Sequence, residues 1–244
     1  MKLVFSSSLL FLSGGVFVEF ALLVLNDEYH KVELAGGYCD GNCSVCRKCT
    51  NNRNIVTLIR EENAEFYQKY VLDHQTRTAE LCKKVSEALS LDEGERTILV
   101  QSALLHDIGK LLIPFCILSK NGSLSSYERR IIQFHPLKGA EWLRERDFSE
   151  EIVTIIEAHH EKVDGSGYPY GLKGDEIPFL ARVLAVCDTF EVMISERHYK
   201  PPKSINEALE ELKKEAGRQF DKAVVITFTE MWYNEVKEEK KVVV

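Results

Sequence analysis

The stretch Ile98-Leu-Val-Gln-Ser-Ala-Leu-Leu-His106-Asp107-Ile-Gly109-Lys110 is an apolar run that ends in a histidine–aspartate pair. Its apolar residues recur at the spacing of a buried helix face, and Gly109 is placed to end that helix. A histidine or aspartate inside a protein needs a polar partner or a metal ion, because an unpaired buried charge is costly. The stretch therefore predicts a helical fold with a polar site at the end of a packed helix.

Three further segments carry side chains of the same kind: His135, His159-His160 and Asp188. His159 shares a helical face with three isoleucines, so it is expected to point toward the core. Adjacent helical residues diverge by about 100°, so His159 and His160 converge only if their helix ends between them. The glycine-rich loop 164–174 predicts that end. Taken singly, each of these residues is explained equally well by metal binding and by a structural role, either as a hydrogen-bonded core histidine or as a helix cap. Together they favour a metallohydrolase, because imidazole and carboxylate bind divalent metals.

The order of these motifs resembles the HD-GYP branch of the HD phosphohydrolase superfamily. The likeness spans about residues 68–233 and rests on His74, His106-Asp107-Ile-Gly-Lys110, His135-Pro136, His159-His160-Glu161, Asp164-Gly-Ser-Gly-Tyr168-Pro169, Asp188 and Gln219-Phe-Asp221. Members of that family are compact helical domains that hydrolyse cyclic di-GMP, a bacterial second messenger, with two or three metal ions. The resemblance implies a mainly α protein, with a helical HD-type phosphodiesterase domain over residues 61–244 in the bacterial cytoplasm.

The resemblance also implies a role for each matching residue. Asp107 would bridge two metal ions, with His74, His106 and Asp188 on one and His135, His159 and His160 on the other. A hydroxide held between the ions would attack the phosphodiester. Lys110 matches a lysine that faces the scissile phosphate. Tyr168, Arg197 and Lys200 match positions that contact the bases or phosphates of the ligand, and an ordinary surface role is the alternative for these three.

The number and kind of metal ions are less constrained. Mixed histidine and aspartate ligands suit iron and manganese, which we favour, with zinc and nickel as alternatives. Relatives with three ions carry a glutamate one helical turn before the first histidine, where this chain has Tyr70. A phenol is a poor metal ligand at neutral pH because its ordinary pKa is about 10. We therefore expect two ions.

The chain divides near residue 60. Before it, short apolar stretches broken by glycine and Asn26-Asp27 predict a small region, 1–60, with short strands in hairpins. A signal peptide or membrane anchor over residues 1–25 is the competing interpretation. A span needs about 20 predominantly apolar residues, and this one is interrupted by serines, glycines and Glu19. We therefore expect no membrane span.

The same region holds a cysteine cluster, Cys39, Cys43, Cys46 and Cys49. Four thiolates so close in sequence suit one zinc ion or an iron–sulfur cluster, although their spacing matches neither standard pattern fully. Disulfides or free thiols are the alternative. This cluster makes region 1–60 a candidate sensor or metal module. The remaining cysteines, Cys82, Cys116 and Cys187, are expected to be small buried side chains.

The composition limits the partners. The net charge of −7 excludes a general DNA or RNA binder, because neutralising phosphates requires clustered Lys and Arg. A compact anionic ligand is compatible, since two divalent ions outweigh two carboxylates. The expected function is hydrolysis of cyclic di-GMP to linear pGpG, and further hydrolysis to GMP is left open. The alternatives are a cyclic di-GMP binding module with little turnover, and a phosphohydrolase acting on another nucleotide such as cyclic GMP-AMP. A homodimer or a signalling-protein partner is left open.

Overall fold

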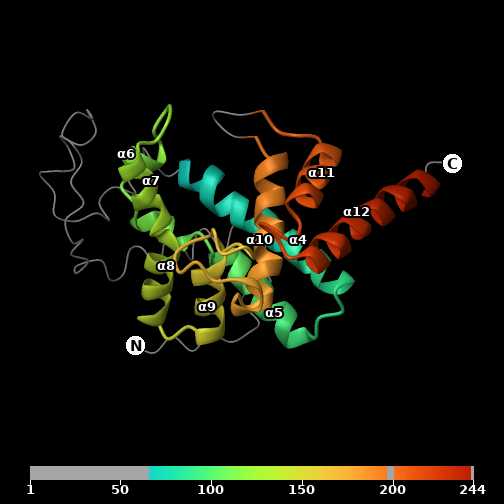
Figure 1. The fold of residues 1–244 in the computed structure, drawn as a ribbon, viewed down its shortest axis with the longest axis horizontal. Coiled ribbons are helices and arrows are strands. Elements are labelled where there is room, and N and C mark those ends of the chain that lie inside the picture. The colour runs from blue at the N-terminus through green and yellow to red at the C-terminus, as the bar shows by residue number, and fades with distance from the viewer. Residues whose placement is uncertain (1–65, 197–200, 243–244) are drawn as a thin grey trace, which may run out of the picture.

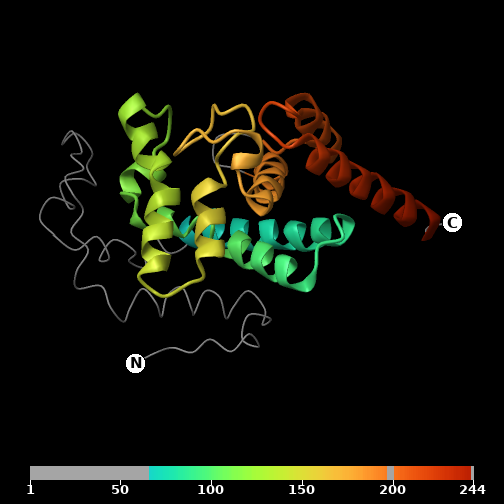
Figure 2. The ribbon, with the colours of Figure 1, turned by 60° about the horizontal axis from the view of Figure 1, so that its bottom comes forward.

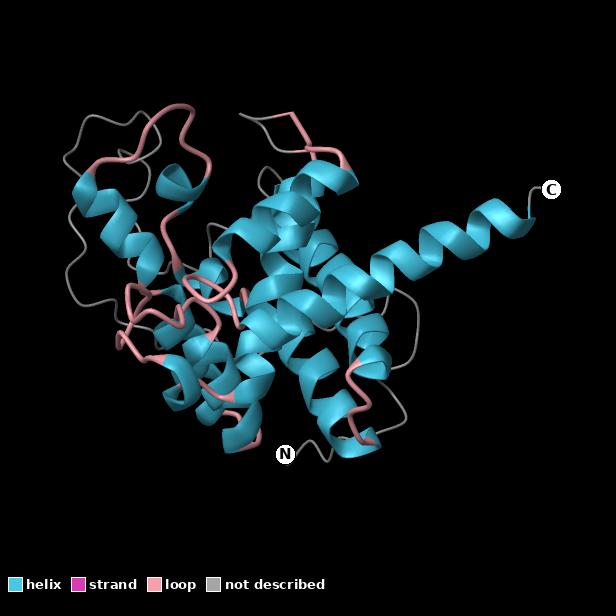
Figure 3. Ribbon diagram, turned by 45° about the vertical axis from the view of Figure 1, so that its right-hand side comes forward, coloured by secondary structure: helices cyan, strands magenta, loops and turns pink. Residues whose placement is uncertain are grey.

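The computed structural model describes residues 66–196 and 201–242, with side-chain surroundings as far as residue 234. This part of the chain is built from helices, and no β-strand occurs in it (Figure 3). The mainly helical class expected from the sequence is therefore confirmed for the described residues. The expected strands of region 1–60, the cysteine cluster, and the ligand candidates Arg197 and Lys200 lie outside the described residues.

Most of the elements follow one another through short loops, and a longer segment, 159–173, joins α9 to η4 (Figure 1). In chain order they are the π-helical turn η2 (Gln68–Leu72), α4 (Asp73–Ala88), α5 (Glu93–Leu105), the 3-10 turn η3 (Ile108–Leu112), α6 (Phe115–Leu118), α7 (Ser126–Gln133), α8 (His135–Arg144), α9 (Glu150–Ala158), the 3-10 turn η4 (Gly174–Glu176), α10 (Phe179–Ile194), α11 (Ile205–Glu215) and α12 (Lys222–Val242).

Three of the described helices begin with a capping box. Asp92, Ser125 and Ser204 each accept a hydrogen bond from a backbone N–H in the first turn, and a glutamate three residues on returns a bond to the cap. Such capping boxes satisfy donors that a helix start leaves free. Gly217 lies two residues beyond the end of α11 with φ +80°, a conformation that glycine adopts without strain.

Two hydrophobic cores support the domain. One is formed mainly by α4, α5, α10, α11 and α12, and the other by η2, η3, α8 and α9. Helices α5 and α9 contribute to both, with Leu99 and Ile155 in the first core and Leu105 and Ile156 in the second. Figure 2 shows α4 and α5 side by side; α9 and α10 pack against this pair, and α8 packs against α9 and η3. The C-terminal ends of α5 and α9 therefore lie where the cores meet.

The C-terminal end of α12 projects from the rest of the domain (Figure 3). Among the described helices, none combines the length and the apolar character needed to cross a membrane. The cysteine expectation holds for Cys82 and Cys187, which are buried, but it is wrong for Cys116, which is only partly buried. Cys116 sits in the single-turn helix α6, which is too short to cover it on all sides.

Two glycines bring the backbones of η3 and α8 into contact. A methyl group on Gly109 would lie 1.9 Å from the carbonyl oxygen of His135 and 2.6 Å from the amide nitrogen of Gly139. Both neighbours are main-chain atoms, which cannot turn aside as a side chain would. The contact fixes the distance between the turn that carries Asp107 and the helix that begins at His135.

We predict that Gly109→Ala destabilises the domain by about 1–3 kcal/mol, the cost of overpacking a tight contact. The measurement is urea unfolding followed by circular dichroism. Gly94→Ala is the matched control: Gly94 is in the first turn of α5, and its new methyl group would meet only the Asp92 carboxylate, at 3.1 Å. Equal stability of the two variants would contradict the close contact.

Candidate metal centre

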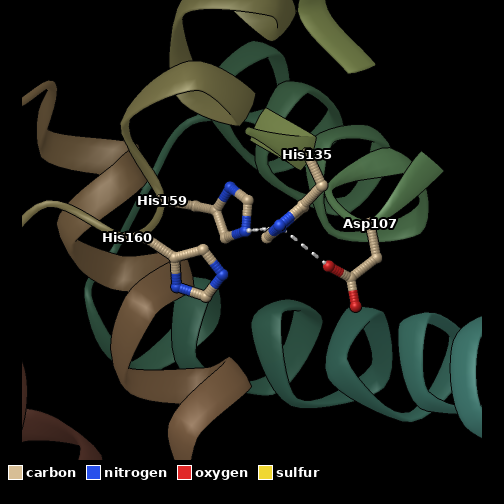
Figure 4. Close-up of side chains that lie close together, drawn as sticks. All are labelled: Asp107, His135, His159 and His160. Carbon is tan, nitrogen blue, oxygen red and sulfur yellow. Dashed lines mark hydrogen bonds and ion pairs between the residues drawn. The ribbon is translucent and has the colours of Figure 1, made fainter. Parts of the chain in front are cut away.

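The sequence-predicted ligands converge on one buried place. Asp107, His135, His159 and His160 bring one ligand atom each within 4.8 Å of one another, and His74, His106 and Asp107 form a second such group. Figure 4 shows the first group, with the three imidazoles facing Asp107. Asp107 belongs to both groups and is 0% exposed. The seventh residue, Asp188, completes the second group, because its Oδ1 lies 3.0 Å from Nε2 of His74 and 3.8 Å from Nε2 of His106.

Helix ends orient three of the histidines. Nδ1 of His106, His135 and His159 lies 2.6 to 2.8 Å from the carbonyl oxygen three residues earlier, in Ala103, Ile132 and Ile156. His106 and His159 are the C-cap residues of α5 and α9, and His135 follows the C-cap of α7. The last carbonyls of a helix have no intrahelical partner, so they accept the ring N–H. A carbonyl can only accept, so each neutral ring carries its proton on Nδ1 and turns the Nε2 lone pair toward the site.

His74 is oriented differently. It lies in the first turn of α4, which continues directly from η2, so the carbonyls nearby are used by the helix. Its Nδ1 instead forms a short hydrogen bond with Oε2 of Glu191, a residue of α10 with 1% exposure. Its Nε2 faces Asp188 and lies 3.2 Å from Nε2 of His106. A carboxylate behind a histidine that faces a metal position is a common arrangement in metal sites.

The donor set fits a cation. Nε2 of His135 lies 3.3 Å from Nε2 of His159 and 3.2 Å from Oδ1 of Asp107. In the neutral rings both nitrogens present lone pairs, and Oδ1 of Asp107 is buried without a hydrogen-bond partner. Three buried acceptors that face one another without a donor repel each other unless a positive charge lies between them. The second group has the mixed imidazole and carboxylate chemistry of a first-row divalent site.

The pKa values describe the same balance. Burial, and then the neighbouring His160, hold the pKa of His159 well below its usual value, and burial and His135 bring the pKa of His160 to about 3. Burial alone would raise the pKa of Asp107, but Lys110 and His106 outweigh it and the pKa is well below normal. For His74 burial acts to lower the pKa, yet Asp188 and Glu191 raise it. The site thus holds the deprotonated carboxylates of Asp107 and Asp188 beside the neutral rings of His106, His159 and His160, whereas His74 is more readily protonated.

The loop after His160 is held by Glu161. The buried Glu161 carboxylate accepts hydrogen bonds from the backbone N–H groups of Tyr170, Gly171 and Leu172. The N–H of Tyr168 donates to the carbonyl oxygen of His160 at 3.2 Å, and the two rings lie 4.9 Å apart at 33°. The loop therefore places one aromatic ring beside the imidazole cluster.

The structure also describes the positions of Lys110 and Tyr70. Nζ of Lys110 lies 2.5 Å from Oδ2 of Asp107, directly at the shared carboxylate. The place of the third-ion glutamate is held by Tyr70, whose ring packs 5.0 Å from that of Phe66. The expectation of two ions rather than three remains a prediction.

Glu191 and the role of Glu161 were missed by sequence reasoning. Glu191 follows Asp188 by three residues on the same helix, and Glu161 follows the double histidine directly. Both are carboxylates in otherwise apolar or turn-forming segments, which is the one signal that points to them.

The comparisons with known proteins agree with this geometry. The sequence profile of the HD domain family matches residues 59–224, so the chain belongs to the HD domain family. Its resemblance to the HD-GYP branch is confirmed by relatives. It is 37% identical over 161 residues to the 3′3′-cGAMP-specific phosphodiesterase 2 of Vibrio cholerae, covering 65% of this chain and 31% of that protein. It is 40% identical over 147 residues to the cyclic di-GMP phosphodiesterase response regulator RpfG of Xanthomonas campestris, covering 59% of this chain and 39% of the relative.

The chain thus spans well under half the length of these curated relatives. A solved structure of a cyclic GMP-AMP specific phosphodiesterase of V. cholerae superposes with a TM-score of 0.53 at 26% identity, over 66% of this chain and 44% of the other. An HD-GYP-type protein of Bdellovibrio bacteriovorus, Bd1817, superposes with a TM-score of 0.58 at 16% identity, over 90% and 62% of the two chains, and supports the fold alone.

We predict that Asp107→Ala reduces the metal content of both positions, because it removes the one residue shared by the two groups. Elemental analysis should find less than one metal ion per chain in the variant, where the wild type should hold two. Retention of two ions per chain would contradict the assignment of Asp107 as the bridge.

A second prediction concerns the metal-free protein. His160 has a pKa of about 3 in the folded state and about 6.5 when unfolded. The unfolded state therefore binds more protons between these values, and stability present above pH 6.5 is lost as the pH falls. His106 and His159 act in the same direction and His74 opposes them.

Chelator-treated protein should accordingly be less stable at pH 5.5 than at pH 7.5 in urea unfolding. Each histidine whose pKa is lowered in the folded state contributes up to about 1.4 kcal/mol per pH unit to the pH dependence of the unfolding free energy. His160→Gln, which cannot titrate, should reduce the dependence by about one proton. An unchanged slope would show that His160 is not held neutral.

Proposed function

We propose that this domain is a metal-dependent cyclic dinucleotide phosphodiesterase, and that cyclic di-GMP is its substrate, cleaved to linear pGpG, with the step from pGpG to GMP left open. The observation that carries the proposal is the pair of buried histidine–aspartate groups that share Asp107. The relationship to RpfG supports the choice of substrate, because that relative is a cyclic di-GMP phosphodiesterase.

The residues divide the work as follows. Asp107, His74, His106 and Asp188 would hold one divalent ion, and Asp107, His135, His159 and His160 the other. When bound, such a pair supplies Lewis-acid chemistry that activates water and offsets phosphate charge. Iron and manganese remain the favoured ions.

Lys110 and Tyr168 would act on the substrate itself. The Lys110 side chain is 23% exposed, so its ammonium can reach a phosphate oxygen outside the ligand shell. Tyr168 presents an aromatic ring beside His160, where a guanine base could stack. Arg197 and Lys200 are proposed as further contacts to phosphate or base, on their sequence positions alone.

Cyclic GMP-AMP is a second candidate substrate, because the relative at 37% identity is specific for 3′3′-cGAMP. A binding module that turns over little is the alternative from another class. It is disfavoured because Lys110 and a complete set of ligands serve catalysis and are not needed for binding.

We predict cleavage of cyclic di-GMP by anaerobically purified protein loaded with Fe²⁺ or Mn²⁺. Separate incubations with cyclic di-GMP and 3′3′-cGAMP, with the linear and mononucleotide products resolved by chromatography, will decide between the substrates. Binding without cleavage of either, at two metal ions per chain, would favour the binding module.

Tyr168→Ala tests the stacking role within the same experiment. We expect the apparent affinity for substrate to fall by about tenfold, since one base–aromatic stack contributes about 1–3 kcal/mol, with metal content unchanged. Tyr170→Ala is the matched control, because Tyr170 lies in the same loop but is 57% exposed. Metal loss in Tyr168→Ala would instead make the residue part of the metal centre.

A further inference from the structure

The two proposed metal positions are supported by different parts of the chain. The histidines His135 and His159 of one position are oriented by backbone carbonyls, and so is His106. These acceptors persist whatever side chains the helices carry. His74 is held by a side chain, Glu191, which comes from a helix 117 residues further along the chain. The orientation of His74 therefore depends on a side chain that a substitution can change.

The two oxygens of Glu191 have separate partners. Oε2 meets Nδ1 of His74, while Oε1 accepts hydrogen bonds from Nε of Arg77 and from Oγ of Ser195, each at 2.5 Å. Arg77 lies three residues after His74 on α4, and Ser195 is the C-cap of α10. Donors from two elements thus fix the plane of the carboxylate, and the fixed carboxylate directs the imidazole.

We propose that Glu191 is a positioning residue that holds His74 in its metal-binding orientation, so that one metal position depends on Glu191 and the other does not. The inference rests on the proposed two-metal centre, but not on the choice of substrate. The hydrogen bonds described above join Glu191 to His74, Arg77 and Ser195, and none of these residues belongs to the His135, His159 and His160 group. Its influence should therefore be confined to the position formed by His74, His106 and Asp188.

Glutamine is the informative replacement. Glu191→Gln keeps the size of the side chain but has one acceptor oxygen and one donor amide. If the oxygen faces His74, the amide meets the N–H of Arg77, and if it faces Arg77, the amide meets the N–H of His74. One donor is left without an acceptor in either case, so the anchored arrangement cannot be restored by a rotation of the amide.

The experiment is a titration of chelator-stripped protein with Mn²⁺, followed by calorimetry and by the electron paramagnetic resonance of free Mn²⁺. Wild type should bind two ions per chain. In Glu191→Gln, one binding step should weaken by about 10–100-fold, the usual effect of losing a partner behind a metal-binding histidine, and the other step should be unchanged. Glu196→Gln is the control, since Glu196 lies just beyond the same helix with a side chain that is 80% exposed.

A second variant shows to which metal position the weakened binding step belongs. His159→Ala should leave a single ion at the His74 position. Adding Glu191→Gln to this variant should weaken the binding of that ion by the same factor. Thermal unfolding separates positioning from a purely structural role: a structural role lowers the midpoint equally with and without Mn²⁺, whereas the proposal predicts a smaller rise on adding Mn²⁺.

Two results would overturn the inference alone: unchanged Mn²⁺ affinity in Glu191→Gln, or equal weakening of both steps, with two ions bound in wild type. Failure of the wild type to bind two ions would overturn the proposed centre, and this inference with it. Failure to cleave a dinucleotide would leave the titration result standing, so the two proposals fail in distinguishable ways.

Discussion

A carboxylate with no exposure, Asp107, lies where the two hydrophobic cores meet, and burial of that charge is the constraint on which the site depends. A buried anion is stable only when positive charge or hydrogen-bond donors surround it. Lys110 reaches Oδ2, but Oδ1 has no hydrogen-bond donor and lies beside the imidazole cluster, in which burial keeps His159 neutral. Metal ions at both sides of Asp107 would resolve the conflict, and this is why the donor set is consistent with a divalent centre rather than with a polar core.

Helix termination supplies most of the required order. The free carbonyls at the ends of α5, α7 and α9 select the ring tautomer of three histidines, and the end of α9 also lets His159 and His160 converge. The main chain acts again at Gly109, where η3 and α8 touch. The spacing of the ligands is therefore set largely by backbone geometry, with Glu191 and Glu161 as the side-chain exceptions.

Local signals predicted the elements well. The apolar run before His106 forms the second half of α5, and α9 ends at Ala158, close to where the need for His159 and His160 to share a site placed its end. The convergence of His74, His106, Asp107, His135, His159, His160 and Asp188 was predicted from apolar spacing and motif order. Their separation into two groups that share Asp107 was implied by the family resemblance.

The features that could not be predicted are tertiary contacts between residues that are distant in the sequence. Glu191 reaches His74 across 117 residues, and no local pattern marks which carboxylate will lie behind which imidazole. The same is true of Gly109, whose lack of a side chain matters only because the backbone of His135 and Gly139 packs against it. Glu161 could have been suspected from its place beside the histidines, but its three backbone donors come from a loop whose path the sequence does not specify.

The proposed ligands come from five separate places in the chain, between residues 74 and 188. In the unfolded chain these places are far apart, so each bound ion would act as a reversible cross-link between distant segments. The free energy of metal binding then adds to the free energy of folding, by an amount that grows with the free metal concentration. Metal supply in the cell would consequently set how much of this domain survives proteolysis, and the level of the protein itself would follow the metal status of the cell.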